Sequence, residues 1–219
     1  MPSILFGSIG SIADTSELQR QSFNQAFARH KLDWHWSQDE YSAMLKKNGG
    51  TQRIKDYAIS LGQSVDAAAI HESKSQIFQE YLQAGKVKPR PGVVETIAQT
   101  KQQGLKLALV TTTSEKNVSS LLLGLGSDIN RTDFDLVVDV SMVERPKPAV
   151  DAYALALEKL NEKPENCIAI EDNLGGLLAA KSAEISCVAF PGENNTGYDF
   201  SKADLRVNKL YFDELKRFI

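Results

Sequence analysis

Short apolar runs alternate with longer amphipathic segments over most of the second half of the chain. Five runs rich in Ile, Leu and Val predict strands, at residues 4–6, 105–110, 134–138, 167–170 and 186–190. The segments between them predict helices, at residues 92–104, 114–123, 148–160 and 175–183. Near-continuous hydrophobic strands separated by helices predict an α/β fold, in which a parallel sheet is covered by helices on both faces. Ligand sites of such sheets lie at the carboxyl ends of the strands.

Residues 16–86 depart from this alternation, because they show helical periodicity without a convincing strand. The pattern predicts four helices, at residues 16–31, 37–47, 51–61 and 65–83. In the first of them Leu18, Ser22 and Ala26 share a face with Phe23 and Phe27. We therefore expect two domains, an α/β core of residues 1–15 and 87–219 and a helical insert of residues 16–86. Prolines in the segment 86–92 suit the connection back to the core.

Composition and charge argue against a nucleic-acid-binding protein and against a membrane protein. The net charge of −3 and the isoelectric point of about 5.7 argue against a nucleic-acid partner, since such modules carry a basic face. No segment approaches the roughly 18 apolar residues of a membrane span. The N-terminus lacks a basic stretch followed by a long apolar one, so we expect no signal peptide and a cytoplasmic protein. Cys167 and Cys187 lie in apolar runs and are expected to be buried free thiols in a reducing compartment.

Four short motifs follow the predicted strands in a recognisable order. They are Phe6-Gly7-Ser8-Ile9-Gly10-Ser11, Val110-Thr111-Thr112-Thr113-Ser114, Arg145-Pro146-Lys147-Pro148 and Ile170-Glu171-Asp172-Asn173. This series resembles the motifs of the haloacid dehalogenase superfamily of phosphatases, with the helical insert in the place of that superfamily's cap. Residues within the insert, around Arg20, 22–27, 32–36 and 48–54, are similar to the CbbY-type sugar-phosphate phosphatases, relatives of β-phosphoglucomutase.

The resemblance implies a two-step phosphoryl transfer. The first motif usually reads Asp-x-Asp-Gly-Thr, where one aspartate attacks phosphorus and the other serves as general acid and base. Here Gly7 and Ile9 stand at those two positions. Gly7 has no side chain with which to attack, and Ile9 can neither donate nor accept a proton. General acid–base catalysis alone contributes roughly 10²–10⁴-fold, so we predict that the phosphatase activity is lost.

Three other residues near the first motif could replace the missing aspartate. Ser8 is expected to point to the opposite side of the strand from Gly7. Ser11 matches the usual threonine, and Asp14 lies at the entrance to the insert. Loop and capping chemistry is the favoured interpretation for all three.

The remaining motifs predict an anion site. The resemblance implies that Thr111, Thr112 and Lys147 bind phosphate, with backbone N–H groups of a helix start adding to the site. Capping of that helix by Thr113 or Ser114 is compatible with this role. Pro148 is expected to be a first helical residue.

The resemblance also assigns residues of the insert and of the metal site. Arg20, Arg53 and Arg90 are candidates for substrate contact. Gln19 and Thr51 stand where CbbY-type sequences commonly have histidine and lysine, which argues against that branch's sugar-bisphosphate specificity.

Glu171 and Asp172 match the acidic motif that holds Mg²⁺ in the family. Because the aspartate missing at Gly7 is normally a third ligand, we predict weak or absent Mg²⁺ binding. Pairing of either carboxylate with Lys147 is the alternative interpretation.

Our leading hypothesis is a pseudoenzyme that binds a phosphorylated metabolite, another anion or a protein partner. The first alternative is a working sugar-phosphate phosphatase with an atypical nucleophile. The second is a structural or assembly subunit with a vestigial pocket. No nucleic acid and no membrane is expected as a partner.

Overall fold

A parallel sheet forms the centre of the molecule in the computed structural model, which describes residues 1–46, 49–85 and 87–219. The strands in this part of the chain are β1 (Ser3–Phe6), β2 (Lys106–Val110), β3 (Leu136–Val138), β4 (Cys167–Glu171), β5 (Ser186–Ala189) and β6 (Leu205–Arg206). Their order across the sheet is β3-β2-β1-β4-β5-β6, and all neighbours run parallel. Phe6 pairs with Leu109 on one side and Ile170 on the other, so β1, β2 and β4 end at the same edge.

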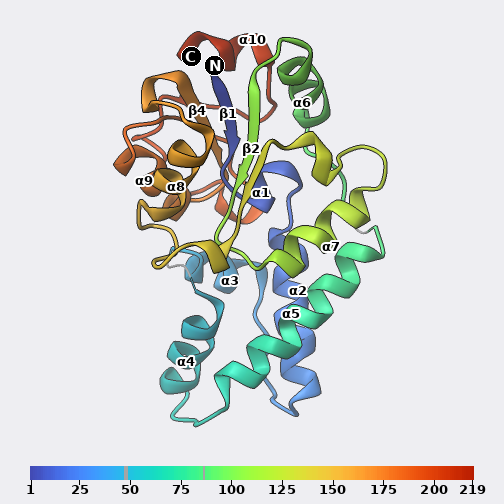
Figure 1. Ribbon diagram of the computed structural model, residues 1–219. Coiled ribbons are helices and arrows are strands. Elements are labelled where there is room, and N and C mark those ends of the chain that lie inside the picture. Colours follow the sequence, from blue (N-terminus) through green and yellow to red (C-terminus); the bar gives the residue numbers. More distant parts are fainter. Residues whose placement is uncertain (47–48, 86) are drawn as a thin grey trace.

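Helices cover both faces of this sheet because its strands are apolar on both sides. Ile4 and Phe6 pack into one buried cluster, whereas Leu5 packs into the other. The first cluster includes residues of α6 (Val93–Gln102), α7 (Glu115–Leu125) and α10 (Phe212–Leu215). The second includes residues of α8 (Asp151–Leu160) and α9 (Leu174–Ser182). Figure 1 shows α8 and α9 on one side of the sheet and α6 on the other.

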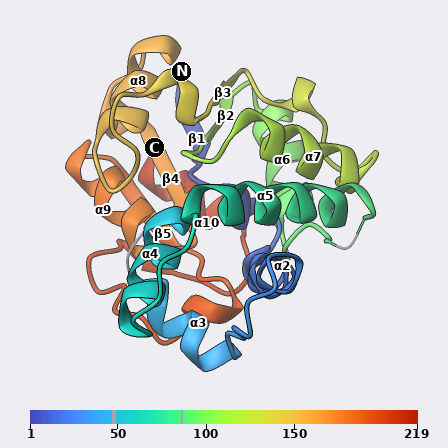
Figure 2. The ribbon, with the colours of Figure 1, turned by 90° about the horizontal axis from the view of Figure 1, so that it is seen from below.

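Of the described helices between β1 and β2, the four in the insert lie beyond the carboxyl ends of the strands, far from both chain termini (Figure 1). They are α2 (Ser16–Arg29), α3 (Gln38–Met44), α4 (Gly50–Ser60) and α5 (Ala67–Gln83). Their side chains form a third buried cluster, which is rich in aromatic rings. The rings of Phe27 and Trp36 meet edge to face with centroids 4.7 Å apart, and Phe23 lies 4.9 Å from Trp36. Viewed from below, α5 lies between α2 and α7 (Figure 2).

Helix α5 packs across the boundary predicted at residue 86 between the insert and the core. Phe78 and Leu82 of α5, and Leu18 of α2, join the cluster that covers the sheet, although they belong to the insert. The insert therefore has a core of its own and also packs on α7. The two-domain division remains a prediction. Three residues lie outside the described part of the chain. They are Lys47, which ends one expected helix, Asn48, which follows it, and Lys86, which ends the insert.

Several local expectations are corrected by the structure. The short helix α1 (Ile9–Ile12) and β6 were not predicted. The helix expected to open at Pro148 begins at Asp151, and Pro148 lies in a turn before it. The helix predicted at residues 114–123 continues through Gly124 to Leu125. Among the described helices none is long and apolar enough to cross a membrane.

Gly124 lies where α7 packs against the backbone of α5. A Cβ atom at this position would lie 1.9 Å from the carbonyl oxygen of Leu82, which is backbone and cannot move aside cheaply. We predict that Gly124→Ala lowers the free energy of unfolding by about 1–3 kcal/mol, although alanine favours helices more than glycine does. Urea denaturation measures this, with Gly197→Ala as control because nothing lies within 4 Å of that position. Equal stability of the two variants would contradict the close contact.

Candidate functional site

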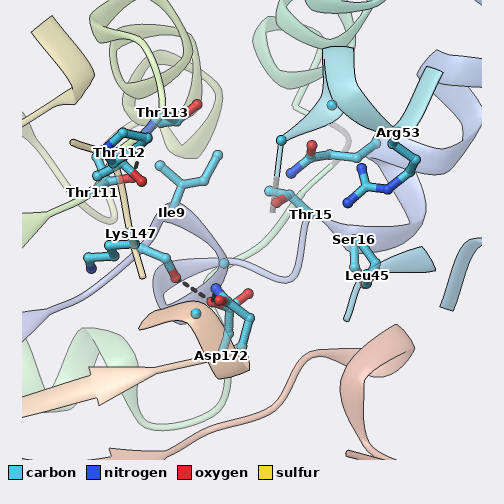
Figure 3. A pocket seen from close by; sticks show the side chains of 18 of the residues that line it. Ile9, Thr15, Ser16, Leu45, Arg53, Thr111, Thr112, Thr113, Lys147 and Asp172 are labelled. Atoms are coloured by element: carbon cyan, nitrogen blue, oxygen red, sulfur yellow. Dashed lines mark hydrogen bonds between the residues drawn. The ribbon is translucent and has the colours of Figure 1, made fainter. Parts of the chain in front are cut away.

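A cavity of about 990 Å³ lies between the strand ends and the helices of the insert. The loops that follow β1, β2 and β4 line one side, and residues of α2, α4 and α5 line the other. Figure 3 shows Thr111, Thr112 and Lys147 on one side of the cavity and Arg53 on the other, with Ile9 between them. The structure thus brings together residues that are far apart in the sequence.

The loop after β1 carries the altered first motif. Ser8 caps α1, since its Oγ accepts a hydrogen bond from the N–H of Ser11. The same Oγ donates to Oδ1 of Asp172 at 2.6 Å. Asp14 accepts hydrogen bonds from the backbone and hydroxyl of Ser16. Capping and loop chemistry therefore accounts for these residues, as the sequence favours.

The space beside Gly7 is filled by other residues. A Cβ atom there would lie 2.1 Å from Oε1 of Glu171 and 2.3 Å from the hydroxyl of Tyr153. Gly176 bounds the same space, because a Cβ atom there would lie 2.0 Å from Oε2 of Glu171. The Glu171 carboxylate thus occupies the region that a side chain at position 7 would need. Ser8 faces Asp172 instead, in the opposite direction, as the strand alternation predicts.

A buried ion pair lies directly beneath this space. Nζ of Lys147 donates to Oε1 of Glu171 at 2.7 Å and to the carbonyl oxygens of Val110, at 2.6 Å, and Gly7. The hydroxyl of Tyr153 donates to the same carboxylate oxygen at 2.7 Å. Burial raises the pKa of Glu171 above its usual range, against the opposing attraction of Lys147. The three N–H bonds of Lys147 all have acceptors here, so a phosphate would compete with these contacts.

Two longer helices begin at the cavity. Ser114 caps α7 by accepting from the N–H of Asn117, and Asn173 caps α9 by accepting from the N–H of Gly176. Residues 112–114 and 173–175 line the cavity. The positive ends of both helix dipoles therefore face it, which favours an anion without any catalytic demand. Thr111 is buried, and its Oγ1 accepts from the N–H of Thr113.

The three predicted arginines have different surroundings. Arg53 lines the cavity, with its guanidinium 5.5 Å from the ring centroid of Tyr41. Arg20 binds both carboxylate oxygens of Glu17 and the carbonyl oxygen of Trp36, and it is not among the lining residues.

Arg90 also lies outside the lining. It donates to the carbonyl oxygens of Phe190 and Pro191, each at 2.6 Å, and to that of Gly10 at 3.1 Å. This arrangement ties the first loop to the segment after β5. The structure therefore brings only Arg53, of these three arginines, to the cavity.

Two lining residues were missed by the sequence reasoning. Lys74 of α5 is only 4% exposed and donates to Oε1 of Gln19 at 2.9 Å. Burial, with a contribution from Arg53, lowers the pKa of Lys74 to about 7. Burial and the nearby charges of Lys74 and Arg53 lower the pKa of His71 to about 4. A lysine on an apolar helix face, four residues from both Ile70 and Phe78, was the signal available in the sequence.

Charge in the cavity is unbalanced. In the described part of the chain, the basic lining residues are Lys46, Arg53, Lys74 and Lys147, and the acidic lining residue is Asp172. The two pKa values just given leave His71 neutral and Lys74 partly charged near pH 7. The field therefore favours an anion.

The oxygen donors do not fit Mg²⁺, the metal that the family resemblance implies. Only Asp172 presents a carboxylate to the cavity among the described residues, and its Oδ1 already accepts from Ser8 and Asn173. Glu171 is committed to Lys147 and Tyr153. No cluster of three or more His, Cys, Asp or Glu side chains suited to a metal occurs in the described part of the chain. Mg²⁺ needs near-octahedral oxygen ligation, usually with one or two carboxylates besides ligand oxygens.

The sequence profile of haloacid dehalogenase-like hydrolases matches residues 4–190. The chain belongs to this family. Its parallel sheet flanked by helices is the haloacid dehalogenase-like fold, and the CbbY-type branch is supported by relatives across nearly the whole chain.

Among curated relatives, protein CbbY of Rhodobacter capsulatus is 37% identical over 213 residues, which cover 96% of this chain and 94% of that protein. Protein CbbY of Cereibacter sphaeroides is 38% identical over 207 residues, covering 92% and 89%. The crystal structure of CbbY from Rhodobacter sphaeroides in complex with phosphate matches with a TM-score of 0.86 at 36% identity, covering 95% of each chain. A mutant of that protein in complex with xylulose 1,5-bisphosphate matches equally well.

The lowered pKa of Lys74 predicts that the free energy of unfolding depends on pH. Its pKa falls from 10.5 to about 7 on folding, so between these values the unfolded chain binds more protons than the folded one. Lys74 therefore increases the free energy of unfolding as the pH rises above 7, by up to about 1.4 kcal/mol per pH unit. We predict that Lys74→Met removes this rise between pH 7 and about 8, below the usual pKa values of cysteine and tyrosine, about 8.5 and about 10.

Urea denaturation at several pH values measures the slope for the parent protein and the variant. Lys46→Met, at an exposed position in the same cavity, is the matched control and should keep the parent slope. Identical slopes for the parent and Lys74→Met would contradict a depressed pKa.

Proposed function

We propose that this protein binds a phosphorylated sugar or a related organic phosphate in the cavity and does not hydrolyse it through an aspartyl-phosphate. The observation that carries the proposal is the filled space beside Gly7. Glu171 and Tyr153 occupy the region where an attacking carboxylate would stand, whereas the cavity above it is intact and cationic. The CbbY structures with phosphate and with xylulose 1,5-bisphosphate support this class of ligand.

The charged groups suggest how such a ligand is oriented. A phosphate group fits near the starts of α7 and α9, where two helix dipoles converge. The rest of the ligand then points toward the insert, where Arg53 provides a cation. Ile9 lies between these two ends and presents an apolar surface, so no proton reaches a leaving oxygen from that position.

Calorimetry with sugar phosphates and sugar bisphosphates, with and without Mg²⁺, tests the binding. A phosphatase assay on the same compounds and on a generic aryl phosphate tests the absence of turnover. We expect binding that depends little on Mg²⁺ and no release of phosphate. Turnover at ordinary enzyme rates, together with a covalent phosphorylated intermediate, would favour the atypical phosphatase and reject the proposal.

Arg53 should contribute to affinity. A hydrogen bond to a charged group contributes about 1.5–3 kcal/mol, so we predict that Arg53→Gln raises the Kd for a sugar bisphosphate by roughly 10- to 100-fold. Arg20→Gln is the matched control, because the Arg20 guanidinium is held by Glu17 outside the lining and its loss should change Kd less than about twofold. Equal effects of the two variants would place the ligand away from Arg53.

Restoring the first motif should fail without a further change. In Gly7→Asp with Ile9→Asp, the new Cβ at position 7 would collide with Glu171 and Tyr153, which are held by the ion pair. We predict a less stable protein without phosphatase activity. Adding Tyr153→Phe removes the hydroxyl 2.3 Å from that Cβ and should recover part of the stability. Thermal unfolding and an aryl phosphate assay measure both effects, and full activity of the double variant would show that the space is open.

A further inference from the structure

Lys74 is a buried basic residue in the wall of the cavity. No carboxylate lies within salt-bridge distance of its amine among the described residues. Its Nζ meets the amide oxygen of Gln19 and the ring faces of Phe23 and Phe78, whose centroids lie 4.9 and 4.6 Å away. The side chain nevertheless lines the cavity, together with Gln19 and Phe23.

This environment favours the neutral amine. Burial without an anionic partner penalises the ammonium form, and Arg53, on the same side of the cavity, adds repulsion, while the two rings and Gln19 offset part of the cost. His71, one turn earlier on α5, is also depressed in pKa and adds no positive charge near pH 7. With a pKa of about 7, half of the Lys74 amines are neutral at that pH. An ordinary lysine side chain is neutral in roughly one molecule in two to three thousand.

A neutral amine beside a ligand cavity is a nucleophile toward carbonyl groups. We propose that Lys74 forms an imine with the aldehyde or ketone group of an open-chain phosphorylated carbonyl compound bound in the cavity. The inference rests on the proposed function, because the phosphate at the strand ends holds the ligand while its carbonyl carbon faces the insert.

The step needs only a proton from water besides the amine and the carbonyl. Nζ of the neutral lysine attacks the carbonyl carbon, a C–N bond forms, and one proton moves from the nitrogen to the carbonyl oxygen to give a carbinolamine. That hydroxyl takes up one proton and leaves as water, so one neutral amine, one carbonyl and one proton yield one iminium and one water. The link is reversible, and the lining glutamine, Gln19, which accepts the N–H of Lys74, can accept the N–H of the iminium in the same place.

Pyridoxal 5′-phosphate, a phosphorylated aldehyde, is the probe, followed by borohydride reduction and peptide mass spectrometry. At pH 7.5 and less than one equivalent of probe, we expect the reduced adduct at Lys74 at least tenfold faster than at any other lysine. Inorganic phosphate should slow the reaction, and pyridoxal, which lacks the phosphate, should react at least fivefold more slowly. Modification spread over exposed lysines with Lys74 unmodified would overturn the inference.

Two comparisons separate this inference from the proposed function. If Lys74 stays unmodified while calorimetry detects sugar-phosphate binding, the imine is rejected and the binding function stands. If Lys74 reacts equally fast with both aldehydes and phosphate does not compete, the phosphorylated ligand is rejected together with the proposed function. Lys74→Arg keeps a cation but cannot form an imine, so it should lose the adduct, whereas Lys55→Arg, at an exposed position outside the lining, should retain it. The labelling of the parent protein decides the matter even if a variant fails to fold.

Discussion

The ion pair of Lys147 and Glu171 holds the strand ends together beneath the cavity. Lys147 also donates to carbonyl oxygens at the ends of β1 and β2, and Glu171 is the last residue of β4, so one amine joins three neighbouring strands. Removing two charges from water is costly, and the hydrogen bonds that Lys147 and Tyr153 donate to Oε1 of Glu171 offset part of that cost, whereas Oε2 has no hydrogen-bond partner among the described residues. The pair fits because glycines stand at positions 7 and 176, where any larger side chain would enter the space of the carboxylate.

Catalysis and anion binding depend on different parts of this site. A nucleophile and a general acid depend on particular side chains, and both positions have changed in this chain. The helix starts that face the cavity depend on backbone N–H groups and capping residues, which are unchanged by that loss. A cavity that attracts anions can therefore persist after the chemistry has gone, and the cations of the insert add to it.

The sequence predicted the elements of the core well, because five apolar runs are long enough to specify buried strands. It missed β6, which contains only Leu205 and Arg206, and α1, which spans four residues inside a motif. It left open which of Glu171 and Asp172 pairs with Lys147, and in the structure Glu171 does. The surroundings of Arg90 could not be predicted in this way, because the carbonyl groups that bind it lie about a hundred residues further along the chain. Family positions indicate where an arginine stands, but tertiary neighbours decide where its guanidinium points.

The aromatic cluster of the insert has a consequence for spectroscopy. Both tryptophans of the chain, Trp34 and Trp36, lie in that cluster, and each packs edge to face on the rings of Phe27 and Tyr57. The sheet and its covering helices contribute only phenylalanine and tyrosine. Indole fluorescence therefore reports on the four helices above the cavity, while far-ultraviolet circular dichroism reports on the whole chain. Disagreement between these two signals during unfolding would show directly that the insert and the sheet lose their structure separately.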